Sequence, residues 1–300
     1  MRKPNFFLIG APKCGTSSLA NWLAQHPNVF FSDPKEPHYF STDTLCSVTR
    51  LAQYERYFEG VAPEHVAIGE GSTHYLHSQV AVPSILEYNP DARFIVCLRD
   101  PVDMAPSVHS ERIFSGIEDV ISFAEAWRLQ DERDLGNHIP INARRQPFFV
   151  QYRSFCRQGE MVERLLSNVS MDRVLVLLLD DLRDSPASTY ARTLEFLDVD
   201  PDFEAEFEVQ NERKTVKSPR LANMIRYGAT IKRRLGSDRR LGVGAFLRDL
   251  NGSRGAREQM DAALEQEMRD YYRSDVDLLE SLIGQNLSAW RTSHQQVHDA

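Results

Sequence analysis

The sequence has few cysteines, and no two of them are close together. The four thiols belong to Cys14, Cys46, Cys97 and Cys156, which form no C-x-x-C pair. Scattered cysteines of this kind exclude a recognisable zinc site and a compact disulfide framework. They predict reduced thiols in a cytoplasmic compartment, and we expect no metal to be required.

Long apolar runs and an excess of positive charge are also missing. No stretch approaches the roughly 20 apolar residues that span a membrane, and residues 1–30 lack the order of a signal peptide. We therefore expect a soluble protein without a transmembrane segment. The net charge of −8 argues against a protein that coats nucleic acid, although a local basic pocket for a small anion is compatible with it.

What the chain does contain is ordinary globular composition over 300 residues, with 42% hydrophobic and 26% charged residues. Short apolar segments at 6–9, 66–69, 94–98 and 174–179 are predicted to be buried strands, and helical spacing separates them. Strands that alternate with helices predict an α/β fold, a three-layer sandwich around a central parallel sheet. Ligands of such sheets bind at the carboxyl ends of the strands.

Three segments are expected to elaborate this core within one domain, residues 1–300. Residues 116–170 are predicted to form a helical insertion, and residues 210–256 a basic, glycine-interrupted flap. A C-terminal helix is expected at about residues 257–285, where apolar residues recur at helical spacing.

The segment from Gly10 to Ser18, with the sequence GAPKCGTSS, lies between the first strand and the first helix. The first N–H groups of a helix have no internal partners, and its dipole favours an anion. Gly15 allows close backbone approach, Lys13 adds a charge, and three hydroxyls add donors. The segment is therefore predicted to cradle a phosphate; an ordinary strand-to-helix turn is the alternative.

The order of residues in this loop differs from the Walker A pattern, in which a lysine follows the second glycine. Here Thr16 holds that position and Lys13 precedes Gly15. The loop resembles the 5′-phosphosulfate loop of the sulfotransferases that use 3′-phosphoadenosine-5′-phosphosulfate (PAPS), and so implies their P-loop NTPase-like fold. In that resemblance Lys13 contacts the bridging oxygen or the sulfuryl group. The remaining loop residues hold the 5′-phosphate: Cys14, Gly15, Thr16, Ser17 and Ser18.

A second motif follows the strand at 94–98. Arg99-Asp100-Pro101 and, eight residues after the arginine, Ser107 resemble the family's 3′-phosphate motif R-[DN]-P-x5-S. A strand-end arginine and a serine two helical turns along can converge on one phosphate. This pair favours PAPS over ATP, because ATP has no 3′-phosphate.

A basic segment at 211–220 resembles, loosely, a loop that closes over the nucleotide in family members. Lys214, Lys217 and Arg220 are its candidate nucleotide contacts, and a solvated charged loop is an equal alternative.

The string Lys35-Glu36-Pro37-His38-Tyr39-Phe40 resembles the segment that carries the proposed base in the heparan- and bacterial-type branch. Glu36 is the predicted base, with a pKa expected to be raised beside a phosphosulfate. A surface Lys–Glu pair in a turn is the alternative. His74 is the second choice, since the cytosolic branch uses a histidine in this region.

Two features bear on other substrates and other functions. Some carbohydrate-type members carry a lysine where this chain has Gly71, which puts a glycosaminoglycan acceptor in doubt. Asp180-Asp181, at the end of an apolar strand, resembles a Walker B site, so an NTP-dependent kinase is an alternative. A non-catalytic protein that binds the product PAP is another. The sequence does not identify the acceptor, which could be a carbohydrate, a lipid or a small metabolite with a hydroxyl or amine. It also leaves open whether the protein forms a homodimer.

Overall fold

The computed structural model describes residues 2–45, 47–207, 214–216, 252–254 and 260–292. They fall into two compact units. The first contains the described residues within 1–101, 157–210 and 269–300, and the second those within 102–156 and 211–268. The predicted basic flap at 210–256 lies almost entirely outside the described residues. Within those residues, no helix combines the length and the apolar character that crossing a bilayer requires.

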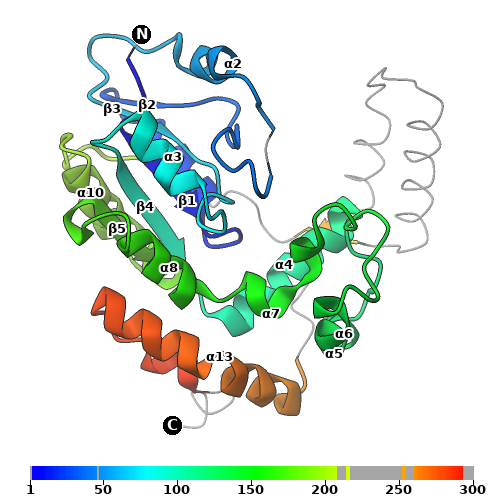
Figure 1. The fold of residues 1–300 in the computed structure, drawn as a ribbon. Coiled ribbons are helices and arrows are strands. Elements are labelled where there is room, and N and C mark those ends of the chain that lie inside the picture. The colour runs from blue at the N-terminus through cyan, green and yellow to red at the C-terminus, as the bar shows by residue number, and fades with distance from the viewer. Residues whose placement is uncertain (1, 46, 208–213, 217–251, 255–259, 293–300) are drawn as a thin grey trace. The chain divides into compact units, whose positions relative to one another are not determined.

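Five parallel strands form the sheet of the first unit, in the order β2-β3-β1-β4-β5 (Figure 1). They are β1 (Phe6–Gly10), β2 (Val29–Phe31), β3 (Ala67–Glu70), β4 (Arg93–Leu98) and β5 (Val174–Leu178). Every residue of β1 and β3 is buried, as expected for strands covered on both faces. The predicted α/β fold with a central parallel sheet is confirmed.

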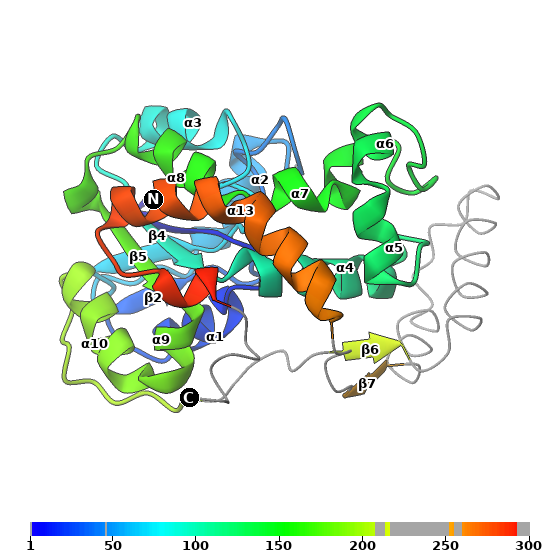
Figure 2. The same cartoon turned by 90° about the horizontal axis from the view of Figure 1, so that it is seen from below.

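Helices cover both faces of this sheet (Figure 2). One face carries α3 (Ala81–Tyr88) and α8 (Gln158–Leu166). The other carries α1 (Thr16–Leu23), α9 (Leu179–Asp184) and α10 (Pro186–Phe196). The shorter helices of this unit are α2 (Leu51–Glu55), η1 (Arg56–Phe58), η3 (Met171–Arg173) and η4 (Ser288–Arg291).

The edge strand β2 was not predicted from the sequence. It has three residues, Val29–Phe31, which pair in parallel with Ala67–Gly69 of β3. Three residues are too few to show a periodicity, and the pairing with β3 defines the strand. Its consequence is functional, because β2 leads the chain into the segment that contains Glu36.

The C-terminal helix α13 (Ala262–Ile283) ends in the first unit. There the Asp275 carboxylate accepts hydrogen bonds from the backbone N–H groups of Gly159 (2.9 Å) and Glu160 (3.1 Å), in the first turn of α8. A negative charge at this end suits the helix dipole. Arg269 pairs with Asp100 at 3.2 Å, and both side chains are buried. The helix thus holds the residue that follows Arg99 and the start of α8.

The second unit is organised by a buried ion pair. It takes in most of α4 (Pro101–Ser115) and, in full, α5 (Phe123–Arg128), α6 (Gln130–Asp134), η2 (Pro147–Val150) and α7 (Tyr152–Phe155). The Arg133 guanidinium donates to both carboxylate oxygens of Glu118, at 2.7 and 2.9 Å, and the Tyr152 hydroxyl donates to the same carboxylate at 2.8 Å. Two strands, β6 (Lys214–Val216) and β7 (Gly252–Arg254), pair in antiparallel fashion.

Candidate active site

The segments singled out in the sequence lie after neighbouring strands of the first unit. The 10–18 loop follows β1, Arg99 follows β4, and Glu36 and His74 follow β2 and β3. Parallel neighbours end at the same edge of a sheet, and that edge is where ligands of α/β folds bind. The sheet order therefore gathers the predicted loops at one edge.

The loop after β1 has the backbone of an anion cradle. Gly15 is the N-cap of α1 with a φ of 86°, a conformation that glycine adopts without strain. A Cβ at Gly15 would also lie 3.0 Å from a methyl carbon of Leu179 and of Leu182. Lys13 has a φ of 66° in the same left-handed region. The first N–H groups of α1 thus follow directly on a glycine whose conformation and surroundings suit this turn, an arrangement that favours an anion at a helix N-terminus.

Cys14 lies within the loop, and its thiol is fully buried. Burial raises the pKa of this thiol to about 12, and the opposing charges of Arg99 and Lys13 do not offset it. The thiol is therefore protonated at neutral pH. It donates to the backbone carbonyl of Pro12 at 3.4 Å, which leaves the backbone N–H of Cys14 as the candidate ligand contact.

Arg99 contacts the same loop. Its guanidinium donates to the backbone carbonyl of Lys13, with 3.3 Å between Nη1 and O. Its backbone is held by Gln158, whose Oε1 accepts from the Arg99 N–H at 3.0 Å and whose Nε2 donates to the Arg99 carbonyl at 2.5 Å. Gln158 is buried and begins α8. Its role could not be predicted from the sequence, because an isolated glutamine belongs to no motif.

Ser107 is buried on α4. It belongs to the second unit and Arg99 to the first. Their convergence on one 3′-phosphate stays a prediction. The proposed nucleotide contacts Lys217 and Arg220 lie outside the described residues, and Lys214 begins β6, of which only the backbone is described.

Glu36 lies among three polar side chains. Its Oε1 accepts from Lys35 Nζ and from Thr73 Oγ1, each at 3.3 Å. Its Oε2 is 3.2 Å from Nε2 of His38. The carboxyl side chain remains 36% exposed. The candidate base is thus held in one orientation and still open to an acceptor.

The expectation of a raised pKa for Glu36 is wrong for the protein without substrate. Burial does raise the pKa, but the hydrogen bond from His38 and the positive charge of Lys35 outweigh it and lower the pKa to about 2. The carboxyl is therefore ionised and can accept a proton, but it is a weak base while both partners remain beside it.

Lys35 connects the Glu36 segment to the 10–18 loop. Its Nζ donates to Thr16 Oγ1 at 3.3 Å as well as to Glu36. The space beside Gly71 is filled by the same side chain, since a Cβ at residue 71 would lie 2.8 Å from Lys35 Cε. The chain thus lacks a lysine at 71 but brings another lysine across that position.

His38 is held by the residues that follow β3. Its backbone N–H donates to Ser72 Oγ at 3.0 Å, and Ser72 donates to Glu70 Oε2 at 2.6 Å. Glu36 and His38 both have left-handed backbones, with φ values of 67° and 48°. Backbone strain of this kind is concentrated at functional sites. The sequence offered a signal for His38 in its position two residues after Glu36, but no role was assigned to it.

His74 lies deeper than Glu36. It is 5% exposed, and the centre of its ring is 5.3 Å from that of His38. A base must reach the acceptor proton, so the greater exposure of Glu36 favours the carboxylate. His74 stays the second choice.

Glu70 should make the stability of the protein depend on pH. Burial raises its pKa from 4.5 to about 7, although hydrogen bonds from Ser72, Tyr75 and Tyr54 oppose the change. Between these values the folded protein keeps a proton that the unfolded chain has lost. The free energy of unfolding should therefore fall as pH rises through this window.

Glu70→Gln, which cannot ionise, should flatten that fall in urea titrations from about pH 5 to about pH 8. Glu59→Gln, at an exposed carboxylate, is the matched control and should keep the wild-type slope. An unchanged slope in Glu70→Gln would show that Glu70 is not the responsible group.

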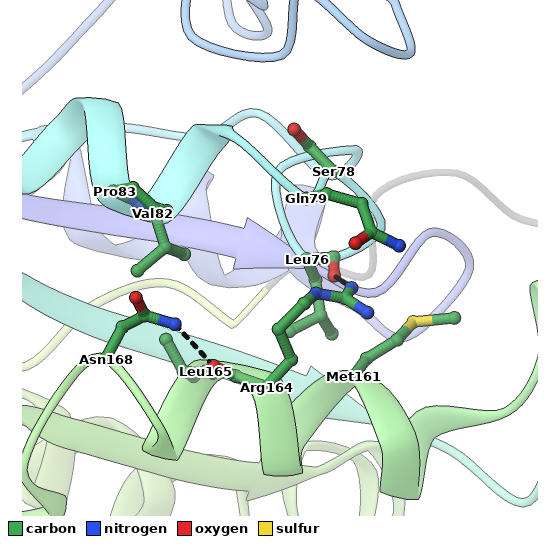
Figure 3. A pocket seen from close by; sticks show the side chains of 9 residues that line it. All are labelled: Leu76, Ser78, Gln79, Val82, Pro83, Met161, Arg164, Leu165 and Asn168. Carbon is green, nitrogen blue, oxygen red and sulfur yellow. Dashed lines mark hydrogen bonds between the residues drawn. The ribbon is translucent and has the colours of Figure 1, made fainter.

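A small pocket between α3 and α8 contains none of the predicted site residues (Figure 3). Arg164 lines it, and its guanidinium donates to the backbone carbonyls of Leu76 (2.6 Å) and His77 (3.2 Å). This arginine therefore fixes the chain after His74, and we assign the pocket no ligand.

The Asp180-Asp181 pair lies in the first turn of α9. Asp180 pairs with Arg183 at 3.0 Å, and Asp181 with Arg192 at 3.7 Å. These carboxylates are half exposed and form ion pairs typical of an acidic helix start. The arrangement favours an acidic start of a helix over a Walker B site.

Comparison with known proteins decides the family. The model of the sulfotransferase domain matches residues 3–280. The chain belongs to the sulfotransferase family. A crystal structure of a sulfotransferase from Alicyclobacillus acidocaldarius is similar over 97% of this chain and all of its own, with 26% identity and a TM-score of 0.73.

Curated relatives are similar over shorter stretches. The membrane-associated sulfotransferase kil1 of Dictyostelium discoideum is 29% identical over 104 residues, which are 35% of this chain and 22% of kil1. Human carbohydrate sulfotransferase 15 is 29% identical over 172 residues, covering 43% of this chain and 29% of that protein. The chain thus spans less than a third of these relatives. Transfer of a sulfuryl group is the reaction for which this family is named.

Proposed function

We propose that this sulfotransferase moves the sulfuryl group of PAPS to a hydroxyl or amine of an acceptor and releases PAP. One observation carries the proposal: the Lys35 ammonium lies 3.3 Å from Thr16 Oγ1 of the 10–18 loop and 3.3 Å from Glu36 Oε1. One side chain spans the distance between the phosphate cradle and the candidate base. A donor held by the loop would therefore present its sulfuryl group to Glu36.

The donor would be held at its 5′-phosphosulfate and at its 3′-phosphate. The N–H groups and hydroxyls of residues 14–18 would bind the 5′-phosphate, with Lys13 at the bridging oxygen. Arg99 and Ser107 would bind the 3′-phosphate, and the basic residues Lys214, Lys217 and Arg220 are proposed to close over the nucleotide. The bond from Arg99 to the Lys13 carbonyl supports this assignment, because it brings the two anchors together.

The transfer is a displacement at sulfur. The acceptor oxygen or nitrogen forms a bond to sulfur while the bond from sulfur to the bridging oxygen breaks, and that electron pair stays on the 5′-phosphate of PAP. The acceptor proton goes to the Glu36 carboxylate. The Lys13 ammonium stabilises the charge that develops on the bridging oxygen, and His38 orients Glu36. No metal has a role in this scheme.

A carbohydrate hydroxyl is the acceptor class to test first. One relative is named carbohydrate sulfotransferase 15, and a carbohydrate is among the acceptors that the sequence leaves open. We keep a cytoplasmic location as part of the proposal, on the ground that Cys14 and Cys97 are buried thiols that form no disulfide with another described residue.

The proposal is tested by incubating the full chain with PAPS and a panel of sugars, lipids and phenolic or alkyl alcohols. Mass spectrometry should detect the gain of one sulfuryl group in one acceptor class, together with PAP. PAP binding without transfer to any class would favour a non-catalytic binding protein instead.

A further inference from the structure

The roles proposed for the 10–18 loop and for Glu36 do not give Lys35 a function of its own. Its ammonium donates to Thr16 Oγ1 in the loop and to Glu36 Oε1, and the side chain is 21% exposed. An ammonium has three N–H donors, and these two acceptors use two of them. The cation therefore stands between the group that would hold the donor and the group that would accept the proton.

The path of this side chain depends on Gly71. A Cβ at residue 71 would lie 2.8 Å from Lys35 Cε and 3.0 Å from Cζ of Phe31. Separations below 3.0 Å force the atoms apart. A side chain at residue 71 would thus require the end of the Lys35 arm to shift from the position that places its ammonium beside Thr16. Gly71 is buried and directly follows the last residue of β3, so this contact lies in the interior and not in a surface turn.

The charge arrangement suggests what the ammonium does when a donor arrives. Beside Glu36 it has one carboxylate as its anionic partner. An anion bound at the N-terminus of α1, next to Thr16, would offer it a second partner at the other end of its reach. A lysine is suited to such a change of partner, because it is a point charge on a flexible stem.

We propose that Lys35 binds the sulfuryl group of the donor, and that Gly71 provides the space through which it reaches that group. The inference rests on the proposed function and adds a residue that distinguishes donor from product, since PAPS carries the sulfuryl group and PAP does not. As Lys35 turns to the sulfuryl group, it leaves Glu36 free to take the acceptor proton.

The test compares the affinities for PAPS and PAP in Lys35→Met, measured by calorimetry without acceptor. Loss of one charge-assisted hydrogen bond should raise the Kd for PAPS about ten- to a hundredfold. The Kd for PAP should stay within about twofold of the wild type, and Lys35→Arg should retain part of the preference. Lys3→Met is the matched control, since Lys3 Nζ donates to the Tyr88 carbonyl and lies outside the site.

Gly71→Ala should weaken PAPS binding in the same direction, and adding it to Lys35→Met should change the ratio of PAPS to PAP affinity little further. Equally weakened binding of PAPS and PAP in Lys35→Met would overturn the inference, because the lysine would then only position the loop or Glu36. Unchanged PAPS binding would overturn it as well. Failure of the wild type to bind PAP would instead contradict the proposed function.

Discussion

Glu36→Gln should lower kcat about 10²–10⁴-fold, which is the usual contribution of a positioned general base. Glutamine keeps the size of the side chain and can still accept hydrogen bonds through its amide oxygen. It cannot accept the acceptor proton at neutral pH. The Kd for PAP should stay within about twofold of the wild type, because the proposed role of Glu36 begins only when an acceptor is bound. Steady-state kinetics with saturating PAPS, paired with PAP calorimetry, measures both quantities.

Two further variants make this test decisive. Glu59→Gln removes an exposed carboxylate far from the predicted motif in sequence and should leave kcat unchanged. His74→Asn tests the second candidate base, and it should lower kcat much less than Glu36→Gln does. If His74→Asn abolished turnover while Glu36→Gln retained it, the histidine would be the base and the assignment of Glu36 would be wrong.

Arg99→Met should raise the Kd for PAP about 10- to 150-fold, the loss expected for hydrogen bonds to a charged group. The Kd for adenosine 5′-phosphate, which lacks the 3′-phosphate, should change much less. Arg99→Lys should fall between the wild type and Arg99→Met, because an ammonium cannot form the bidentate contact of a guanidinium. Competition calorimetry with the two nucleotides gives the comparison directly.

Adenosine 5′-phosphate also serves as a control for the structural role of Arg99. The guanidinium donates to the Lys13 carbonyl, so its removal disturbs the loop to some degree. A disturbed loop would weaken the binding of adenosine 5′-phosphate and of PAP alike, whereas loss of a 3′-phosphate contact would weaken the binding of PAP alone. Equal effects on both nucleotides would remove Arg99 from the 3′-phosphate site and leave it a positioning residue for the loop.

The sequence predicted the parts of the fold that depend on local composition. β1, β4 and β5 are runs of large apolar residues, and their burial in a parallel sheet follows from that composition. The phosphate loop could be predicted for the same reason, because its glycines, lysine and hydroxyls are contiguous. By contrast β2 has three residues and is defined by pairing with a strand almost forty residues away.

The parts of the site that could not be predicted depend on contacts between distant segments. Gln158 holds the backbone of Arg99 from a helix 59 residues further along the chain. The direction of the Glu36 pKa is a similar case, because burial raises it while the hydrogen bond from His38 and the charge of Lys35 lower it. Only the placement of His38 and Lys35 shows that the lowering effects outweigh burial. A motif identifies the carboxylate, but the geometry around it sets its basicity.

The central claim is that the loop after β1 binds a phosphosulfate donor. Titration calorimetry of PAP into the full chain, in buffer that contains a metal chelator, tests it most directly. We expect PAP to bind at one site, and adenosine 5′-phosphate to bind there only weakly. ATP should not displace PAP in this buffer, nor in a separate buffer that contains Mg²⁺ and no chelator. Absence of heat and of any thermal stabilisation by PAP, or magnesium-dependent binding of ATP in its place, would contradict the claim.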